Sequence, residues 1–199
     1  MTKYQKKKIY SGILGLILLL GAYLYNQFFE ADNHLETEQV GDNKELDSVR
    51  FIRCVDGDTI MVEDSNGEKK RIRMIGIDTP ESVASEEERN NKYGVMASEY
   101  TKDLLSKAQT VYLEYDIDAD DQYDRILAYV WLEDVDDTFD EASIKKSMVN
   151  ALIIQNGYGI AKRYEPTVAH DEFFHQLMDE AKSKSIGLWQ YEGFRQLWK

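Results

Sequence analysis

Four residues with the chemistry of a metal site occur in two short stretches of the sequence. The first stretch, CVDGDTIMVE, contains Asp58, and the second, IGIDTPES, contains Asp78, Thr79 and Glu81. Hard divalent cations take their ligands from carboxylates, backbone carbonyls and water. Aspartates at strand ends are usually turn formers, and that explanation is sufficient for Asp56 in the Asp-Gly pair. If the two strand ends met, Asp58 and Asp78 would lie side by side and could share one cation.

Two arginines extend this group. Arg73 shortly precedes the second aspartate, and Arg125 opens a later apolar run. In KKRIRM the residues alternate between two faces, and a solvated basic face accounts for Lys69 and Arg71. A metal polarises a phosphoryl oxygen, guanidinium groups pair bidentately with phosphate charge, and a carboxylate such as Glu81 can deprotonate water. These are the parts needed to hydrolyse a phosphodiester.

Five short runs rich in β-branched and aromatic residues are predicted strands, and three segments have helical periodicity. The Asn-Gly pair between the second and third runs is typical of a hairpin. The order β-β-β-α-β-β-α-α predicts a mainly β fold of the α+β class, a small five-stranded barrel with three helices. The predicted strands are 48–55, 59–64, 69–77, 110–115 and 125–133, and the predicted helices are 95–108, 147–157 and 169–187.

The overall composition restricts the choice of partners. The 199 residues carry a net charge of −13, and four of the basic residues are lysines within the first eight positions. Nucleic-acid affinity comes largely from neutralising phosphates, so an acidic body argues against a polyanionic partner. The single cysteine, Cys54, excludes an internal disulfide, and its apolar surroundings predict a buried thiol rather than a nucleophile.

The N-terminal segment has a lysine-rich start followed by an apolar stretch over residues 9–25. That length is at the short end of what crosses a bilayer, and no small-residue cleavage site follows it. We expect residues 1–29 to be a transmembrane anchor with the N-terminus in the cytoplasm and the body outside; a cleaved signal and a secreted protein is the alternative. Residues 30–47 read as an acidic linker, 48–191 as the globular domain and 192–199 as a C-terminal tail.

Six longer motifs together identify a family. Their order and spacing are similar to those of staphylococcal nuclease (thermonuclease), over about residues 48–190. The resemblance implies an OB fold, a five-stranded barrel with three helices, which agrees with the element order above. The motifs are VDGDTI, RMIGIDTPES, KYGVMAS, DQYDRILAYV, MVNALIIQNGYG and SIGLW.

The resemblance also implies a Ca²⁺-dependent phosphodiesterase that acts on DNA and RNA, breaks the P–O5′ bond and leaves 3′-phosphate ends. By motif, Asp58 and Asp78 match calcium carboxylates, with the Thr79 carbonyl as a further ligand. Asp56 matches an aspartate that supports the metal site without ligating it.

The remaining matches concern the substrate. Glu81 matches a glutamate held near the attacking water and often assigned as the general base, and Arg73 and Arg125 match two phosphate-binding arginines. Tyr123 matches a tyrosine that contacts the nucleotide. Because all the charged members of the family site are present, a decayed copy that only binds is not expected.

The sequence departs from the family pattern at several points. Gln122 replaces a lysine, which removes one cation from the phosphate pocket. A family pair of tyrosines falls near residues 161–166, where Tyr164 keeps one place and Lys162 occupies the other. The loop that follows the second aspartate motif is acidic, and segment 132–143 is expected to be a solvated loop, since it lacks the glycine and ligand spacing of an EF-hand.

Two functions from different classes follow from these residues. The first is a membrane-tethered calcium-dependent nuclease that acts as a monomer on single-stranded or locally open DNA and RNA. Its acidic body predicts weak non-specific affinity for nucleic acid. The second is a non-catalytic OB module that binds nucleic acid or protein at the cell surface. The intact Glu81, Arg73 and Arg125 favour the enzyme, while the acidic loops and Gln122 favour the binding module.

Overall fold

The computed structural model describes residues 46–82, 91–117, 121, 123 and 125–199. The predicted membrane anchor or signal, residues 1–29, and nearly all of the predicted acidic linker lie outside the described residues. Gln122 and most of the acidic loop after Glu81 lie outside them as well. Within the described ranges, no helix combines the length and the hydropathy needed to cross a bilayer.

Five strands close into a barrel in the order β1-β2-β3-β6-β5. All neighbours pair antiparallel except β3 and β6, which run parallel. This confirms the predicted five-stranded barrel with helices, the architecture of an OB fold. The barrel strands are β1 (Asp47–Asp56), β2 (Thr59–Glu63), β3 (Lys69–Met74), β5 (Thr110–Glu114) and β6 (Ile126–Trp131).

Alternation along the strands builds the barrel core. In β3, Ile72 and Met74 are buried, whereas Lys69 and Arg71 are exposed and Arg73 is half-buried. Successive side chains point to opposite faces of a strand, so one face of β3 fills the core and the other carries the basic residues. The predicted alternation is confirmed, and Arg73 lies on the outer face of the barrel.

The third predicted strand is interrupted. β3 ends at Met74, a two-residue turn follows, and β4 (Ile77–Asp78) pairs antiparallel with β7 (Ile160–Ala161) in a separate two-stranded sheet. The sequence did not predict this sheet, because each of its strands is only two residues long. It nevertheless carries Asp78 away from the barrel wall and places it beside a distant segment of the chain.

The described residues form five α-helices and one 3-10 helix, more than the three predicted helices. The predicted helix 95–108 begins earlier, because the Asn91 side chain accepts hydrogen bonds from the N–H groups of Tyr93 and Gly94 and caps the first turn. Part of the expected loop 132–143 is helical for a similar reason, since Asp140 caps a helix there. The helices are α2 (Lys92–Leu105), α3 (Glu141–Ser147), α4 (Val149–Gln155), α5 (Asp171–Ser183), η2 (Gly187–Gln190) and α6 (Glu192–Leu197).

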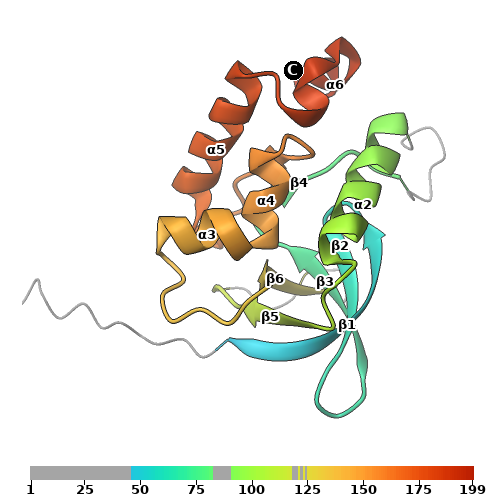
Figure 1. Ribbon diagram of the computed structural model, residues 1–199, viewed down its shortest axis with the longest axis vertical. Coiled ribbons are helices and arrows are strands. Elements are labelled where there is room, and N and C mark those ends of the chain that lie inside the picture. The colour runs from blue at the N-terminus through green and yellow to red at the C-terminus, as the bar shows by residue number, and fades with distance from the viewer. Residues whose placement is uncertain (1–45, 83–90, 118–120, 122, 124) are drawn as a thin grey trace, which may run out of the picture. The chain divides into compact units, whose positions relative to one another are not determined.

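The helices gather on one side of the barrel. In Figure 1, α3 and α4 lie between the barrel strands and α5, with α6 near the far end of α5. His170, which directly precedes α5, is buried, and its Nε2 lies 3.2 Å from Oε1 of the buried Glu114 in β5. The Trp131 indole donates to Oε2 of the same glutamate at 3.0 Å. His170 is therefore a core residue that joins α5 to the barrel.

Candidate active site

Asp58 lies in the tight turn between β1 and β2, and strand register places it beside Arg73. Thr59 pairs with Arg73 across β2 and β3, and the Asp58 carbonyl accepts a hydrogen bond from the Met74 N–H at 2.9 Å. The Arg73 guanidinium lies against the aspartate, with Nη1 2.9 Å from Asp58 Oδ2. The antiparallel hairpin β2-β3 thus brings together two residues that are fifteen positions apart in the chain.

Asp78 meets the same guanidinium from β4. Arg73 Nη2 lies 3.3 Å from Asp78 Oδ1, and the guanidinium also donates to the carbonyls of Met74 (3.0 Å) and Ile77 (3.2 Å). Only 12% of the Arg73 side chain is exposed. Two carboxylates from separate strand ends therefore share one nearly buried arginine, as the repeated Asp-Thr pattern led us to expect.

The surroundings of Asp58 disfavour the ionised form of its carboxyl group. Burial raises the pKa of Asp58; the positive charge of Arg73 opposes that effect, while the negative charges of Asp78 and Asp56 add to it. The net direction is upward. A second positive charge at this point would therefore be favourable, since it would offset both the burial and the repulsion between the carboxylates.

A hard divalent cation fits these residues. Asp58 and Asp78 supply carboxylate oxygens, and the backbone at Thr79 is held in place because its N–H donates to Asp58 Oδ2 at 3.2 Å. In the part of the chain that the structure describes, no group of three or more His, Cys, Asp or Glu side chains is arranged to hold a metal ion. Two carboxylates, a backbone carbonyl and water are nevertheless a donor set suited to calcium, which binds carbonyl and water oxygens as readily as carboxylates.

Asp56 is occupied by other partners. Its Oδ1 accepts hydrogen bonds from the Gly57 N–H at 2.8 Å and from the Ser82 hydroxyl at 2.6 Å, and Oδ2 accepts from the Ser82 N–H at 3.3 Å. These contacts fasten the residue after Glu81 to the β1–β2 turn. Asp56 therefore holds the Glu81 segment in place, a role consistent with a supporting aspartate.

Two glycines allow the chain to pack closely around this segment. A β-carbon on Gly57 would lie 2.6 Å from Thr79 Oγ1, and one on Gly94 in α2 would lie 2.2 Å from the Glu81 carbonyl oxygen. The same carbonyl accepts a hydrogen bond from the Asn91 N–H at 3.2 Å. The backbone carrying Thr79 and Glu81 is thus held between the β1–β2 turn and the first turn of α2.

Arg125 belongs to a second group of contacts. Asp121 Oδ2 accepts from Arg125 Nε at 2.7 Å, and Asp121 Oδ1 accepts from the backbone N–H groups of Tyr123 and Arg125. Burial raises the pKa of Asp121, but these hydrogen bonds outweigh it and lower the pKa overall. The Arg125 guanidinium lies 5.3 Å from the centre of the exposed Tyr123 ring. Two residues predicted to touch the substrate are therefore neighbours.

Strand pairing relates this second group to the first. Arg73 pairs with Leu127 across the parallel strands β3 and β6, and Arg125 lies two residues before Leu127. Arg125 directly precedes β6, so the parallel pairing brings the two predicted phosphate ligands to neighbouring parts of the barrel. Among the contacts of the described residues, none joins the two guanidinium groups directly.

Lys162 contacts a predicted metal ligand, which the sequence did not reveal. Its Nζ lies 2.6 Å from Asp78 Oδ2 and 5.2 Å from the centre of the Tyr164 ring. Burial lowers the pKa of Lys162, but its hydrogen bonds to Asp78 and Tyr164 outweigh that effect and raise the pKa. Through this lysine, Tyr164, which is 40% exposed, is connected to the predicted metal ligands.

Sequence signals for the additional residues are unequal. Asp121 could have been found, because it begins the DQYDR motif and forms a local ion pair with Arg125, four residues later. Ser82 directly follows Glu81 and its small polar side chain gave a weak signal. The sequence placed Lys162 only at the position of a family tyrosine, and nothing in it signalled the contact with Asp78, which lies 84 positions away.

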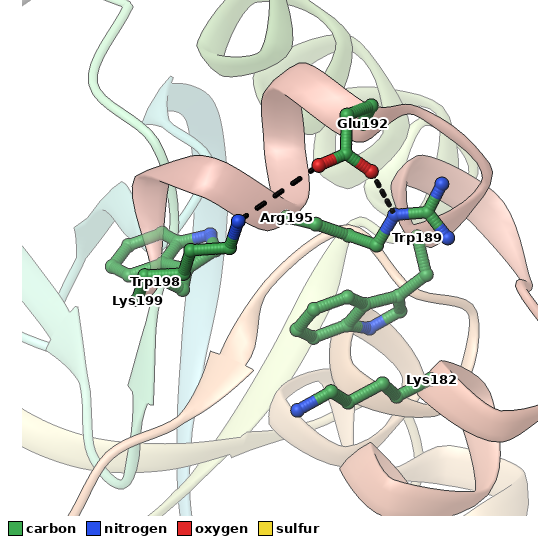
Figure 2. A pocket seen from close by; sticks show the side chains of 6 residues that line it. All are labelled: Lys182, Trp189, Glu192, Arg195, Trp198 and Lys199. Carbon is green, nitrogen blue, oxygen red and sulfur yellow. Dashed lines mark ion pairs between the residues drawn. The ribbon is translucent and has the colours of Figure 1, made fainter.

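A pocket of about 400 Å³ between α5, η2 and α6 is lined by other residues (Figure 2). Lys182 lies 5.6 Å from the Trp189 ring centre, and Glu192 forms ion pairs with Arg195 at 3.3 Å and Lys199 at 3.9 Å. None of the predicted site residues lines this pocket, and its single carboxylate is already paired with two cations. The volume of this pocket therefore does not identify it as the active site. The site is identified instead by the two carboxylates, Asp58 and Asp78, that contact Arg73.

Comparison with known proteins shows the family to which the chain belongs. Residues 71–191 match the family model described as staphylococcal nuclease homologue. The chain is 34% identical to a thermonuclease of Staphylococcus intermedius over 184 residues, which cover 92% of this chain and 99% of that protein. It is 34% identical to a thermonuclease of Staphylococcus hyicus (88% and 95% covered) and 30% identical to endonuclease YncB of Bacillus subtilis (strain 168) (85% and 74% covered). The chain therefore belongs to the staphylococcal nuclease family.

Proposed function

We propose that this protein is a calcium-dependent nuclease that hydrolyses the P–O5′ bond of DNA and RNA and leaves 3′-phosphate ends. The relatives named thermonuclease and endonuclease support a nuclease activity. The observation that carries the proposal is the convergence of Asp58 and Asp78 on the nearly buried Arg73, from strand ends that the fold brings together.

In this proposal Asp58, Asp78 and the Thr79 carbonyl hold the calcium ion. When bound, the ion would polarise a phosphoryl oxygen and offset the charge that accumulates during hydrolysis. Asp58 is suited to this task, because burial and the negative charge of Asp78 disfavour its ionised form, and a bound cation would offset both effects.

The other residues act on the phosphate and on water. Arg73 in β3 and Arg125, which directly precedes the neighbouring strand β6, would pair with the nonbridging oxygens of the scissile phosphate. Glu81 would orient the attacking water and accept its proton while the 5′-oxygen leaves. Gly94 packs closely against the Glu81 backbone and so fixes the position from which the Glu81 side chain extends. Tyr123 and Tyr164, both exposed, would contact the nucleotide on either side.

A single assay tests the enzyme against the binding module. Hydrolysis of single-stranded DNA is measured with Ca²⁺ or with EGTA, for the wild type and for Arg73→Ala. We expect cleavage with calcium only, and a loss of at least about a hundredfold in the variant, because Arg73 touches both metal carboxylates. Cleavage in EGTA, or full activity in the variant, would contradict the mechanism; DNA binding without any cleavage would favour the non-catalytic OB module.

The placement of the protein in the cell is a further part of the proposal. The lysine-rich start and the apolar stretch over residues 9–25 support a single-pass anchor with the nuclease domain outside the cell. Residues 30–47 would then act as a tether between the membrane and a monomeric domain. Protease added to intact cells should release the domain from the membrane fraction, and a domain found in the medium without protease would instead indicate a cleaved signal.

A further inference from the structure

Lys162 lies where a metal ion and a lysine would compete for one carboxylate. Its Nζ is 2.6 Å from Asp78 Oδ2, while the other oxygen of Asp78 faces Arg73 at 3.3 Å. Both oxygens of the predicted ligand are therefore already in contact with a positive group. Any cation that uses Asp78 must share or displace one of these partners.

The fold places Lys162 here by a specific pairing. β7 runs antiparallel to β4, with Ile160 opposite Asp78, and the Lys162 N–H donates to the Gly76 carbonyl at 2.9 Å. Lys162 and Ile160 are two residues apart, so Lys162 shares the face of Ile160 and stands diagonally across from Asp78. The contact thus follows from backbone register rather than from a long side chain that happens to reach the carboxylate.

The charges of this small cluster already balance. Asp58 and Asp78 contribute two negative charges, and Arg73 and Lys162 contribute two positive ones. Two carboxylates that are already paired with two cations attract a divalent ion less than two free carboxylates would, because the ion gains less Coulomb energy and also meets repulsion from the lysine.

The two cations differ in how firmly they are held. Arg73 is 12% exposed and is bound by two carboxylates and two backbone carbonyls. Lys162 is 45% exposed, has a flexible stem and has Asp78 as its only ion-pair partner among those the structure shows. Of the two, Lys162 is the one that can move aside at small cost.

We infer that Lys162 is a positioning residue that acts as a displaceable counter-ion of Asp78 and weakens the binding of Ca²⁺ to the free protein. The inference rests on the proposed function, because it takes Asp58 and Asp78 as the calcium ligands. Calcium binding would move the ammonium away from Asp78.

The test measures calcium binding without nucleic acid. Isothermal titration of Ca²⁺ into the full chain, kept soluble with detergent, is carried out for the wild type, Lys162→Gln and Lys162→Arg. Lys146→Gln is the matched control, since it removes the same charge from another exposed ion pair, 2.7 Å from Glu133. We expect Lys162→Gln to bind calcium about fivefold or more tightly than the wild type, and the other two variants to bind about as the wild type does.

The outcomes separate the inference from the proposed function. Equal calcium affinity in the wild type and in Lys162→Gln would overturn the inference and leave the calcium site intact. Equal tightening in Lys162→Gln and Lys146→Gln would also overturn it, because net charge rather than the contact with Asp78 would then be responsible. No calcium binding in any variant would overturn the inference and the proposed metal site together.

Discussion

At the scale of single residues, Asp58 illustrates how a functional group can be costly to the fold. Burial and the neighbouring carboxylates raise its pKa above the ordinary value of 3.8, despite the contact with Arg73. A raised pKa means that the folded protein binds this proton more tightly than the unfolded chain does. The folded state therefore loses stability from Asp58 as the pH rises from the ordinary pKa through the raised one.

This linkage gives a pH-dependent expectation for Asp58→Asn. In EGTA, the free energy of unfolding of the variant, relative to that of the wild type, should increase as the pH is raised from 4 to 7. The reason is that only the wild type must ionise a buried carboxyl. Urea unfolding at the two pH values measures the difference. Calcium should reverse the order at pH 7 by stabilising the wild type alone; a gap that stays constant with pH would contradict the argument.

At the scale of elements, α2 serves the site although it supplies none of the predicted site residues. Its cap residue Asn91 donates to the Glu81 carbonyl, and Gly94 lies against the same carbonyl. The next layer is α6, in which Phe194 is fully buried and packs edge-on against Tyr93 at 5.9 Å. The C-terminal helix thus supports the start of α2, which in turn holds the Glu81 segment.

Gly94→Ala tests this support. A β-carbon would lie 2.2 Å from the Glu81 carbonyl oxygen, so the Glu81 backbone or the helix must shift. We expect kcat on single-stranded DNA to fall about a hundredfold, because small misplacements of a catalytic group have effects of that size. Calcium affinity should change little, since Asp58 and Asp78 are held by other contacts.

Val95→Ala is the control for this change, because Val95 is the next residue of the same helix and is 48% exposed. It should leave kcat near that of the wild type. If Gly94→Ala also kept its kcat, the close packing would not determine the position of Glu81.

At the scale of the whole molecule, the net charge of −13 opposes a polyanionic substrate. The cations that face the substrate in the proposed mechanism are few: Arg73, Arg125 and, once displaced, Lys162. Charges farther than about 10 Å are largely screened at ordinary ionic strength, so catalysis can proceed locally while the rest of the surface repels nucleic acid.

The consequence is a shallow dependence of nucleic-acid affinity on salt. With two or three phosphates neutralised, the plot of log K against log salt concentration should have a slope of about −2 or shallower for single strands. Fluorescence anisotropy with a labelled oligonucleotide and the wild-type protein in EGTA, in which we expect no cleavage of the probe, measures this slope. Tight binding that falls steeply with salt would show that a larger basic surface exists.

Parts of this molecule could be read from the sequence because they depend on local order. The alternation in β3, the Asn-Gly turn that follows β2 and the helical period of α5 all arise from residues close in the chain, and each was predicted. Helix α3 was missed because only Ala142 and Ile144 of its seven residues are apolar, which leaves no helical period to detect, and β4 and β7 were missed because two residues have no pattern at all. The motifs around Asp58, Asp78 and Arg125 were recognisable because each is a short contiguous segment.

The sequence by itself determined which chemical groups are available: two Asp-Thr strand ends, a following glutamate, two arginines and a net negative charge over the rest of the chain. Only the tertiary structure decided their partners. Arg73 meets Asp58 through the β2–β3 register and meets Asp78 across the turn between β3 and β4, and Lys162 meets Asp78 through the β4–β7 register, across 84 residues of chain. The physical reason is that residue types and local periods are properties of neighbouring residues, whereas the pairing of a cation with one carboxylate rather than another depends on which strands the closed barrel and the small second sheet bring together.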